Sequence, residues 1–185
     1  MILMSATKIK STLGQMKNQG FDDFQTPRWP VATLMNILES NKHSRDLFTD
    51  ETNIWECACG KGRIVDSLTA MNYNVVSSDI KYGVDFLTTD KVQGEVIITN
   101  PPFSKKTDFL KRCYDLGRPF ALLLPLTAMA GKKRIKMYQE HGAQFIIMKE
   151  RIDFEYPDGT FKGKPWFNGM WVTHGFSLPK DIQWI

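Results

Sequence analysis

Short apolar runs alternate with amphipathic segments through most of this 185-residue chain. Strands are expected at residues 53–57, 74–78, 84–87, 95–99 and 120–125, and helices at residues 30–41, 62–71, 107–116 and 130–141. Apolar strands separated by helices are typical of a parallel sheet that is covered on both faces. The last two strands, 143–153 and 169–176, have no helix between them, which predicts an antiparallel hairpin at one edge. We therefore expect a single α/β domain over residues 1–185.

The composition is that of an ordinary soluble protein, with 42% hydrophobic and 24% charged residues. No apolar stretch approaches the length of a membrane span, and residues 1–4 are too short for the core of a signal peptide. The three cysteines show no zinc-binding spacing, so we expect no metal site and a cytoplasmic location. The polar segment 1–20 is expected to be a mobile arm or a short helix. The net charge of +4 permits a nucleic-acid partner without requiring one.

The expected strand at residues 95–99 ends in an unusual way, because Asn100 is followed by two prolines and Phe103. Prolines donate no backbone N–H and fix φ near about −65°, so this loop is stiff and its carbonyl groups stay available as acceptors. It offers an amide oxygen, a carbonyl and an apolar ring, a set suited to holding a planar group that carries an amine. The alternative is a rigid loop in which Phe103 packs in the core.

A glycine-containing turn from Glu56 to Gly62 follows the first strand and opens a helix. Gly60 and Gly62 allow a ligand to approach the backbone closely, and Val65 stands where a dinucleotide-binding fingerprint has its third glycine. The Glu56 carboxylate would repel a phosphate and attract an ammonium or sulfonium group. This favours a cofactor without phosphates, and the alternative is an ordinary glycine-rich turn.

Two acidic residues follow at positions typical of nucleotide-binding folds. Asp79 ends the second strand at about the spacing of a ribose-binding acid, and it would also suit a helix cap or turn. Asp85 is placed to accept a hydrogen bond from an adenine amino group with Phe86 beside the ring, and the alternative is a turn with a core phenylalanine. The Phe-Gln-Thr-Pro sequence at residues 24–27 is also consistent with ordinary punctuation before a helix.

The order of these motifs resembles that of S-adenosylmethionine-dependent amino-methyltransferases, most of all those that act on the exocyclic amine of adenine in nucleic acids. The resemblance spans about residues 24–176 and implies a Rossmann-like class I methyltransferase fold that binds S-adenosyl-L-methionine. The residues that it assigns to the cofactor are Phe24, Thr26, Pro27, Glu56, Ala58, Gly60, Gly62, Asp79, Asp85 and Phe86. The residues that it assigns to catalysis are Asn100, Pro101, Pro102 and Phe103.

In this interpretation Asn100 positions the target amine and does not remove its proton, because an amide takes up no proton at neutral pH. The Asn100 amide oxygen and the Pro101 carbonyl each accept one N–H of the amine. This draws the nitrogen toward tetrahedral geometry and directs its lone pair at the methyl donor. Phe103 stacks on a base that has left the duplex or is offered single-stranded.

Little of the chain remains for choosing a substrate, since only about eighty residues follow Phe103 and most of them belong to expected elements. A loop at residues 156–168 joins cations to aromatic rings, a combination that binds phosphates and stacks bases. The candidate substrate-binding residues are Lys105, Lys162, Lys164, Trp166 and Phe167. The alternative is that Trp166, Phe167 and Trp171 close the hairpin against the core. A homodimer or a recognition partner would supply what the chain lacks.

The sequence therefore predicts an enzyme that methylates the adenine amino group in nucleic acid, with DNA favoured over RNA. Adenine in RNA, a cytosine amine and a protein glutamine stay open, because the catalytic loop recognises an amine and not a whole substrate. The alternative from another class is a non-catalytic methyltransferase-like scaffold. Both motif loops are intact, which favours the enzyme.

Overall fold

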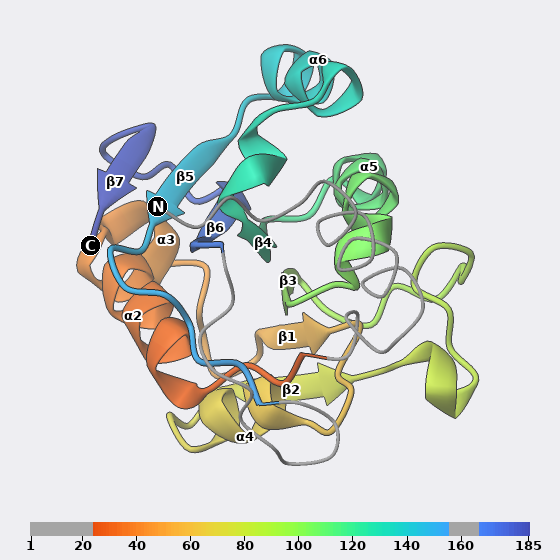
Figure 1. The fold of residues 1–185 in the computed structure, drawn as a ribbon. Helices are drawn as coiled ribbons and strands as arrows, with labels where there is room; N and C mark the ends of the chain where they lie inside the picture. Colours follow the sequence, from red (N-terminus) through yellow and green to blue (C-terminus); the bar gives the residue numbers. More distant parts are fainter. Residues whose placement is uncertain (1–23, 156–166) are drawn as a thin grey trace, which may run out of the picture.

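The computed structural model describes residues 24–155 and 167–185 (Figure 1). Its helices are α2 (Arg28–Ser40), α3 (Lys42–Arg45), α4 (Arg63–Thr69), α5 (Lys106–Leu116) and α6 (Lys132–His141), with 3-10 turns η1 (Ile80–Tyr82), η2 (Phe103–Lys105) and η3 (Leu126–Met129). Its strands are β1 (Asn53–Glu56), β2 (Asn74–Ser77), β3 (Val96–Thr99), β4 (Phe120–Pro125), β5 (Gln144–Ile147), β6 (Gly169–His174) and β7 (Ile182–Trp184). The expected arm at residues 1–20 and most of the expected substrate loop lie outside the described residues.

Seven strands form one sheet in the order β2-β1-β3-β4-β6-β5-β7. β2, β1, β3 and β4 run parallel to one another, β6 is antiparallel to both β4 and β5, and β7 pairs with β5 in parallel. A mostly parallel sheet with a C-terminal antiparallel pair is thus confirmed. The expected place of that pair at the sheet edge is wrong, because β6 lies inside the sheet and the unpredicted β7 forms the edge.

Two expected strands differ from the structure. Residues 84–87 form a turn in which Asp85 Oδ1 accepts a hydrogen bond from the Leu87 N–H at 2.9 Å, while the Asp85 carbonyl accepts one from the Thr89 N–H at 2.8 Å. Asp85 therefore satisfies local backbone donors that a strand would pair across the sheet. The strand expected over residues 143–153 ends at Ile147, where its pairing with β6 stops opposite Met170.

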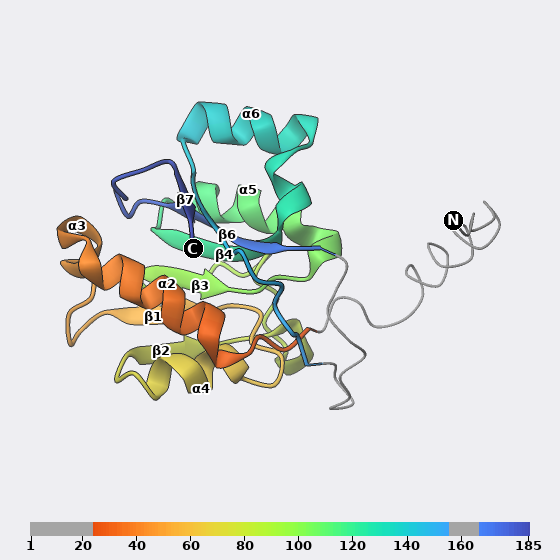
Figure 2. The same ribbon diagram turned by 60° about the vertical axis from the view of Figure 1, so that its left-hand side comes forward.

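Helices cover both faces of the sheet, as the sequence predicts (Figure 2). On one face α2 and α4 bury apolar side chains such as Leu34 and Leu68, and on the other α5 buries Phe109. Successive strand residues point to opposite faces, so Ile98 of β3 joins the first cluster and Ile97 joins the second. No helix within the described ranges is both long and apolar enough to cross a membrane.

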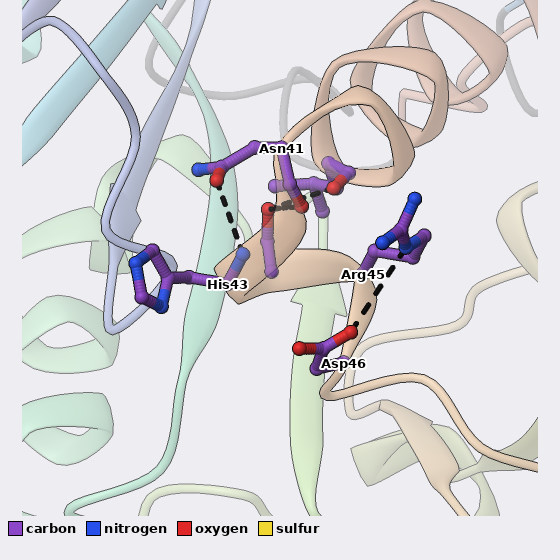
Figure 3. Close-up of polar contacts among 6 residues, drawn as sticks. Asn41, His43, Arg45 and Asp46 are labelled. Carbon is purple, nitrogen blue, oxygen red and sulfur yellow. Dashed lines mark hydrogen bonds and ion pairs between the residues drawn. The ribbon is translucent and has the colours of Figure 1, made fainter.

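Asn41 fixes the junction between α2 and α3 (Figure 3). Its Oδ1 accepts a hydrogen bond from the His43 N–H at 3.2 Å, which caps the short α3, and its Nδ2 donates to the Ser177 carbonyl at 2.8 Å. Ser177 comes shortly after β6, and β6 ends beside Phe120, the first residue of β4. The junction therefore lies at the edge where the parallel strands begin, and the opposite edge is left to the loops that follow them.

Gly94 lies against the backbone of β1. A Cβ at this position would come within 2.7 Å of the Asn53 carbonyl oxygen and 3.0 Å of Trp55 Cβ. We expect Gly94→Ala to lower the free energy of unfolding by about 1–3 kcal/mol, because neither the strand backbone nor the buried Trp55 can give way. Urea denaturation measures the loss, with Gln93→Ala as the control. Equal stability of the two variants would contradict this packing.

Candidate active site

The segments that carry the sequence motifs meet at one edge of the sheet. Because parallel strands end on the same side, the loops after β1, β2 and β3 leave the sheet next to one another. The loop after β1 is the glycine turn, the loop after β2 carries Asp79, and the loop after β3 begins with Asn100. The chain order reverses beside β1, which has β2 on one side and β3 on the other. Open α/β sheets bind ligands in the crevice at such a reversal.

Asp79 holds the glycine turn in place. Its Oδ2 accepts a hydrogen bond from the Gly60 N–H at 2.9 Å, and its Oδ1 accepts one from the Lys81 N–H at 2.8 Å, which caps η1. Gly60 and Gly62 have φ of +52° and +84°, a backbone region that favours glycine, and Gly62 begins α4. A Cβ on Gly62 would meet no atom within 4 Å, so this side of the turn faces open space.

Glu56 is a buried carboxyl group at the end of β1. Its Oε1 accepts hydrogen bonds from the Ala58 N–H at 3.1 Å and from the Thr99 hydroxyl. The pKa of Glu56 is raised to about 8, mainly by burial and in small part by the nearby Asp79 charge, while the two hydrogen bonds act in the opposite direction. The expectation of a standing negative charge at this position is therefore wrong for the protein alone, because the carboxyl is mostly protonated at pH 7.

The Phe-Gln-Thr-Pro segment crosses from the glycine turn to the Asn-Pro-Pro-Phe loop. The Gln25 side-chain oxygen accepts a hydrogen bond from the Lys61 N–H at 3.1 Å. The backbone of Gln25 exchanges two hydrogen bonds with Glu155, at 2.9 and 3.1 Å, and Glu155 forms an ion pair with Arg63 of α4 at 2.5 Å. The segment is thus attached to the turn that begins α4 and to the chain that follows β5.

Asn100 is held by the same segment. Its Nδ2 donates a hydrogen bond to the Phe24 carbonyl at 3.1 Å, which fixes the orientation of the amide and turns Oδ1 away from that carbonyl. Among the described residues, three buried side-chain polar atoms have no hydrogen-bond partner: Thr26 Oγ1, Asn100 Oδ1 and Gln183 Nε2. Such atoms are rare in folded proteins and call for an explanation. Two of the three belong to the motifs selected from the sequence.

Phenylalanine rings pack together beside Asn100. The Phe103 ring lies 5.7 Å from Phe24, 6.2 Å from Phe154 and 5.5 Å from Phe167, measured between ring centroids. Phe103 and Phe167 are half-buried in this cluster. Each ring therefore packs partly against the core and stays partly accessible, which lies between the two alternatives left open by the sequence. Pro101 is buried, and no described residue donates a hydrogen bond to its carbonyl.

The expected contact between Phe86 and a cofactor ring is wrong. Phe86 is 2% exposed and packs between Trp55 and Phe109, with ring centroids 5.2 and 5.0 Å away. The exposed apolar residues near Asp79 are instead Ile80 and Tyr82, at 68% and 69% exposure, which the sequence analysis missed. The signal for Ile80 was present in the sequence, since an apolar residue directly after a strand-end acid has no strand partner to cover it.

The basic and aromatic residues expected to contact substrate are only partly visible. Lys105 is exposed at the end of η2, two residues after Phe103, whereas Lys162, Lys164 and Trp166 lie outside the described residues. Trp171 is fully buried in β6. Within residues 24–155 and 167–185, no three His, Cys, Asp or Glu side chains come together in a way that would hold a metal ion.

Solved structures of similar fold include methyltransferases. The methyltransferase subunit of a type I restriction-modification system from Streptococcus thermophilus aligns with a TM-score of 0.61 and 16% identity, over 95% of this chain and 50% of that one. A modification subunit of a proposed type I restriction enzyme from Vibrio vulnificus gives 0.51 and 13%, over 93% and 50%. A proposed class I S-adenosylmethionine-dependent methyltransferase from Listeria monocytogenes gives 0.56 and 11%, over 96% and 70%.

The chain thus has the Rossmann-like fold of class I methyltransferases, as predicted. It spans about half the length of the two type I subunits. No family model matches the sequence, and no curated protein shows significant sequence similarity to it.

Glu56 gives the stability of the protein a defined pH dependence. A carboxyl whose pKa rises from 4.5 to about 8 on folding holds its proton more tightly in the folded state. Its contribution to stability is therefore complete below about pH 4.5 and is lost as the pH rises toward 8, by at most about 1.4 kcal/mol per pH unit. We expect Glu56→Gln to remove this loss. The free energy of unfolding of the variant should therefore rise relative to that of the wild type between pH 5 and 8.

Urea denaturation at several pH values measures this difference. The matched control is Glu150→Gln, which neutralises an exposed carboxylate. Parallel stability profiles for the wild type and Glu56→Gln would show that Glu56 ionises normally.

Proposed function

We propose that this chain transfers a methyl group from S-adenosyl-L-methionine to the exocyclic amino group of adenine in nucleic acid, with DNA favoured over RNA. The observation that carries the proposal is the Asn100 amide, whose NH2 group is engaged by the Phe24 carbonyl while its buried oxygen has no partner among the described residues. An acceptor left free in a buried site is suited to an N–H donor from a substrate.

The catalytic loop provides acceptors in a fixed geometry. Asn100 Oδ1 takes one N–H of the amine, and the Pro101 carbonyl, which no described residue occupies, takes the other. Both acceptors withdraw the nitrogen lone pair from the aromatic ring and aim it along one direction. The half-buried Phe103 ring forms the apolar side of this site. The proton leaves to solvent after the new N–C bond forms.

S-adenosyl-L-methionine would supply an electrophilic methyl group on a sulfonium, and the sulfur would leave as a neutral thioether when its bond to that methyl group breaks. The residues present fit such a ligand. The glycine turn leaves open space at Gly62, and the Thr26 hydroxyl is buried without a partner. Asp79 retains lone pairs for ribose hydroxyls beyond its two backbone hydrogen bonds. Asp85 is the proposed acceptor for the adenine amine, and the exposed Ile80 takes the place beside the ring that Phe86 cannot fill.

Glu56 links cofactor binding to pH. A sulfonium or ammonium group near its carboxyl favours the ionised form, which is the minor form at pH 7 because the pKa is about 8. Binding of the cationic cofactor therefore releases a proton. Thr99 and Ala58, which donate hydrogen bonds to the carboxyl group, are already placed to stabilise the resulting charge.

The proposed nucleic-acid substrate rests on the fold and on the net charge of +4, which permits a polyanionic partner. Similarity of fold to the modification subunits of restriction systems supports DNA. The two acceptors recognise an amine, so an RNA adenine, a cytosine amine and a protein glutamine are tested in the same assay. Tritiated methyl transfer to duplex DNA, single-stranded DNA, RNA and total protein, followed by nucleoside analysis, should place the label in N6-methyladenine from DNA. Label found only in cytosine or protein would overturn the adenine assignment.

Asn100→Ala should reduce methyl transfer by at least about 100-fold, because it removes an acceptor used at the reacting nitrogen. Calorimetry with S-adenosyl-L-methionine should show unchanged cofactor affinity. Asn36→Ala, on the exposed side of α2, is the control. Full activity of Asn100→Ala would refute the mechanism, and a folded wild type that binds no cofactor would favour a non-catalytic scaffold.

Thr26→Val should separate stability from binding. The substitution keeps the shape of the side chain and removes a buried hydroxyl that has no partner, so we expect a gain of up to about 1–3 kcal/mol in the free energy of unfolding. The same change should weaken cofactor binding about tenfold. Thermal unfolding and calorimetry measure the two effects. A variant that loses stability and keeps its affinity would show that the hydroxyl serves the fold.

A further inference from the structure

The segment that follows β4 leaves the sheet beside the catalytic loop. β4 lies next to β3 and runs parallel to it, with Thr99 opposite Leu122, so η3 and the start of α6 emerge at the same edge as Asn100. On the other side of β3, the edge is taken by the glycine turn and Asp79. With the cofactor placed there, as the proposed function has it, we expect the substrate to approach Asn100 over the β4 side.

Arg134 fixes the start of α6 against the start of α5. Its Nε donates to the Ala128 carbonyl at 2.9 Å, its Nη1 donates to the Thr107 hydroxyl at 2.8 Å, and its Nη2 donates to the Ala130 carbonyl. Thr107 is the second residue of α5, which begins directly after the η2 turn that contains Phe103. Figure 2 shows α5 and α6 on the same side of the sheet. The first turn of α6 is thus held at a fixed place near the catalytic loop.

Lys132 and Lys133 occupy this first turn, and both are exposed. No acidic residue lies in the first turn of α6, and neither lysine forms an ion pair with a described residue. Cations near a helix N-terminus are disfavoured by the helix dipole, by about 0.3–1 kcal/mol each. The two lysines therefore cost stability in the isolated protein, unlike Lys136, which forms an ion pair with Glu140 at 3.5 Å.

Lys105 adds a third exposed cation from the other side of the Arg134–Thr107 contact. Neighbouring basic residues are already engaged: Lys111 pairs with Asp115 at 2.5 Å, and Arg112 donates to the Thr89 carbonyl at 2.6 Å. The cations that stay available on α5 and α6 are thus concentrated at the edge of the sheet where Asn100 lies.

We propose that Lys105, Lys132 and Lys133, the α6 basic surface, bind the sugar–phosphate backbone of the nucleic acid whose adenine enters the site at Asn100. This inference rests on the proposed function. Compact ammonium groups on flexible side chains suit phosphate contacts that position a strand without reading its sequence. The surface would therefore place the target base and leave sequence selection to other elements.

The test is the salt dependence of binding to a fluorescein-labelled adenine-containing oligonucleotide, in duplex and single-stranded form, measured by anisotropy between 50 and 300 mM salt. Each phosphate contact contributes about −0.9 to the slope of log K against log salt for duplex DNA and about −0.7 for a single strand. Lys132→Gln/Lys133→Gln should make the slope less steep by about 1.8 or 1.4, respectively, and weaken binding at least about tenfold at 100 mM salt. Adding Lys105→Gln should make the slope less steep by about a further 0.9 for duplex DNA or about 0.7 for a single strand.

The matched control is Lys42→Gln/Lys180→Gln, which makes the same change in net charge at the opposite edge of the sheet. Lys42 begins α3 beside Asn41, and Lys180 is followed by Asp181, whose carbonyl bonds the second residue of β5. The control should keep the wild-type slope within about 0.5. Affinity for S-adenosyl-L-methionine should stay unchanged in both double variants. The unfolding temperature should stay unchanged in the control and should not fall in Lys132→Gln/Lys133→Gln, because that change removes two cations that the dipole of α6 disfavours.

Two other outcomes overturn the inference in distinguishable ways. Suppose that the wild type binds and methylates DNA, and that both double variants keep the wild-type slope of log K against log salt. The α6 basic surface is then refuted and the proposed function stands. If the wild type binds the cofactor and transfers label only to protein, with no binding to any oligonucleotide, the nucleic-acid substrate and the basic surface fail together.

Discussion

Gln25 connects parts of the chain that lie far apart in the sequence and have to be in register for a site to exist. Its side chain bonds the glycine turn at Lys61, and its backbone pairs with Glu155 after β5. Its neighbour Phe24 holds the amide of Asn100. The parallel strands bring these loops to one edge, but a sheet sets their positions only to within the freedom of each loop. The short segment at residues 24–27 removes much of that freedom, because it bonds to both the glycine turn and the Asn100 side chain.

The polar groups at this edge are arranged for a ligand at some cost to the protein alone. Glu56 is buried and holds a proton at neutral pH, while Thr26 and Asn100 each keep a buried oxygen without a partner among residues 24–155 and 167–185. A chain selected only for stability would replace such groups with apolar ones of similar shape. Their presence together, on three segments that converge, supports the proposal that a ligand supplies the missing partners. The ligand would then complete the hydrogen bonding of the interior.

The sequence was most informative where strand and helix follow one another without insertion. The parallel strands from residue 53 to 125, the helices between them and the gathering of Glu56, Asp79 and Asn100 at strand ends were all predicted. It was least informative where a local turn competes with an apolar run. Asp85 turns the chain by bonding its own backbone neighbours, and Phe86 then points into the core. Neither the insertion of β6 between β4 and β5 nor the unpaired state of Asn100 Oδ1 has a signature in the sequence, since both depend on contacts between distant residues.

The insertion of β6 has a consequence for how such a fold diversifies. β5 leaves the sheet at Ile147 and β6 returns at Gly169, and the Met148 N–H bonds the Gly169 carbonyl at 3.4 Å, so the two ends of this excursion are closed beside the crevice. Lengthening a connection whose ends are already joined costs only about 0.6 kcal/mol for each doubling of its length. New residues added directly before Phe167, whose ring packs on Phe103, would leave the pairing of β5 with β6 intact. The sheet thus provides a point at which the edge that carries Asn100 can acquire loops of different length and composition during evolution.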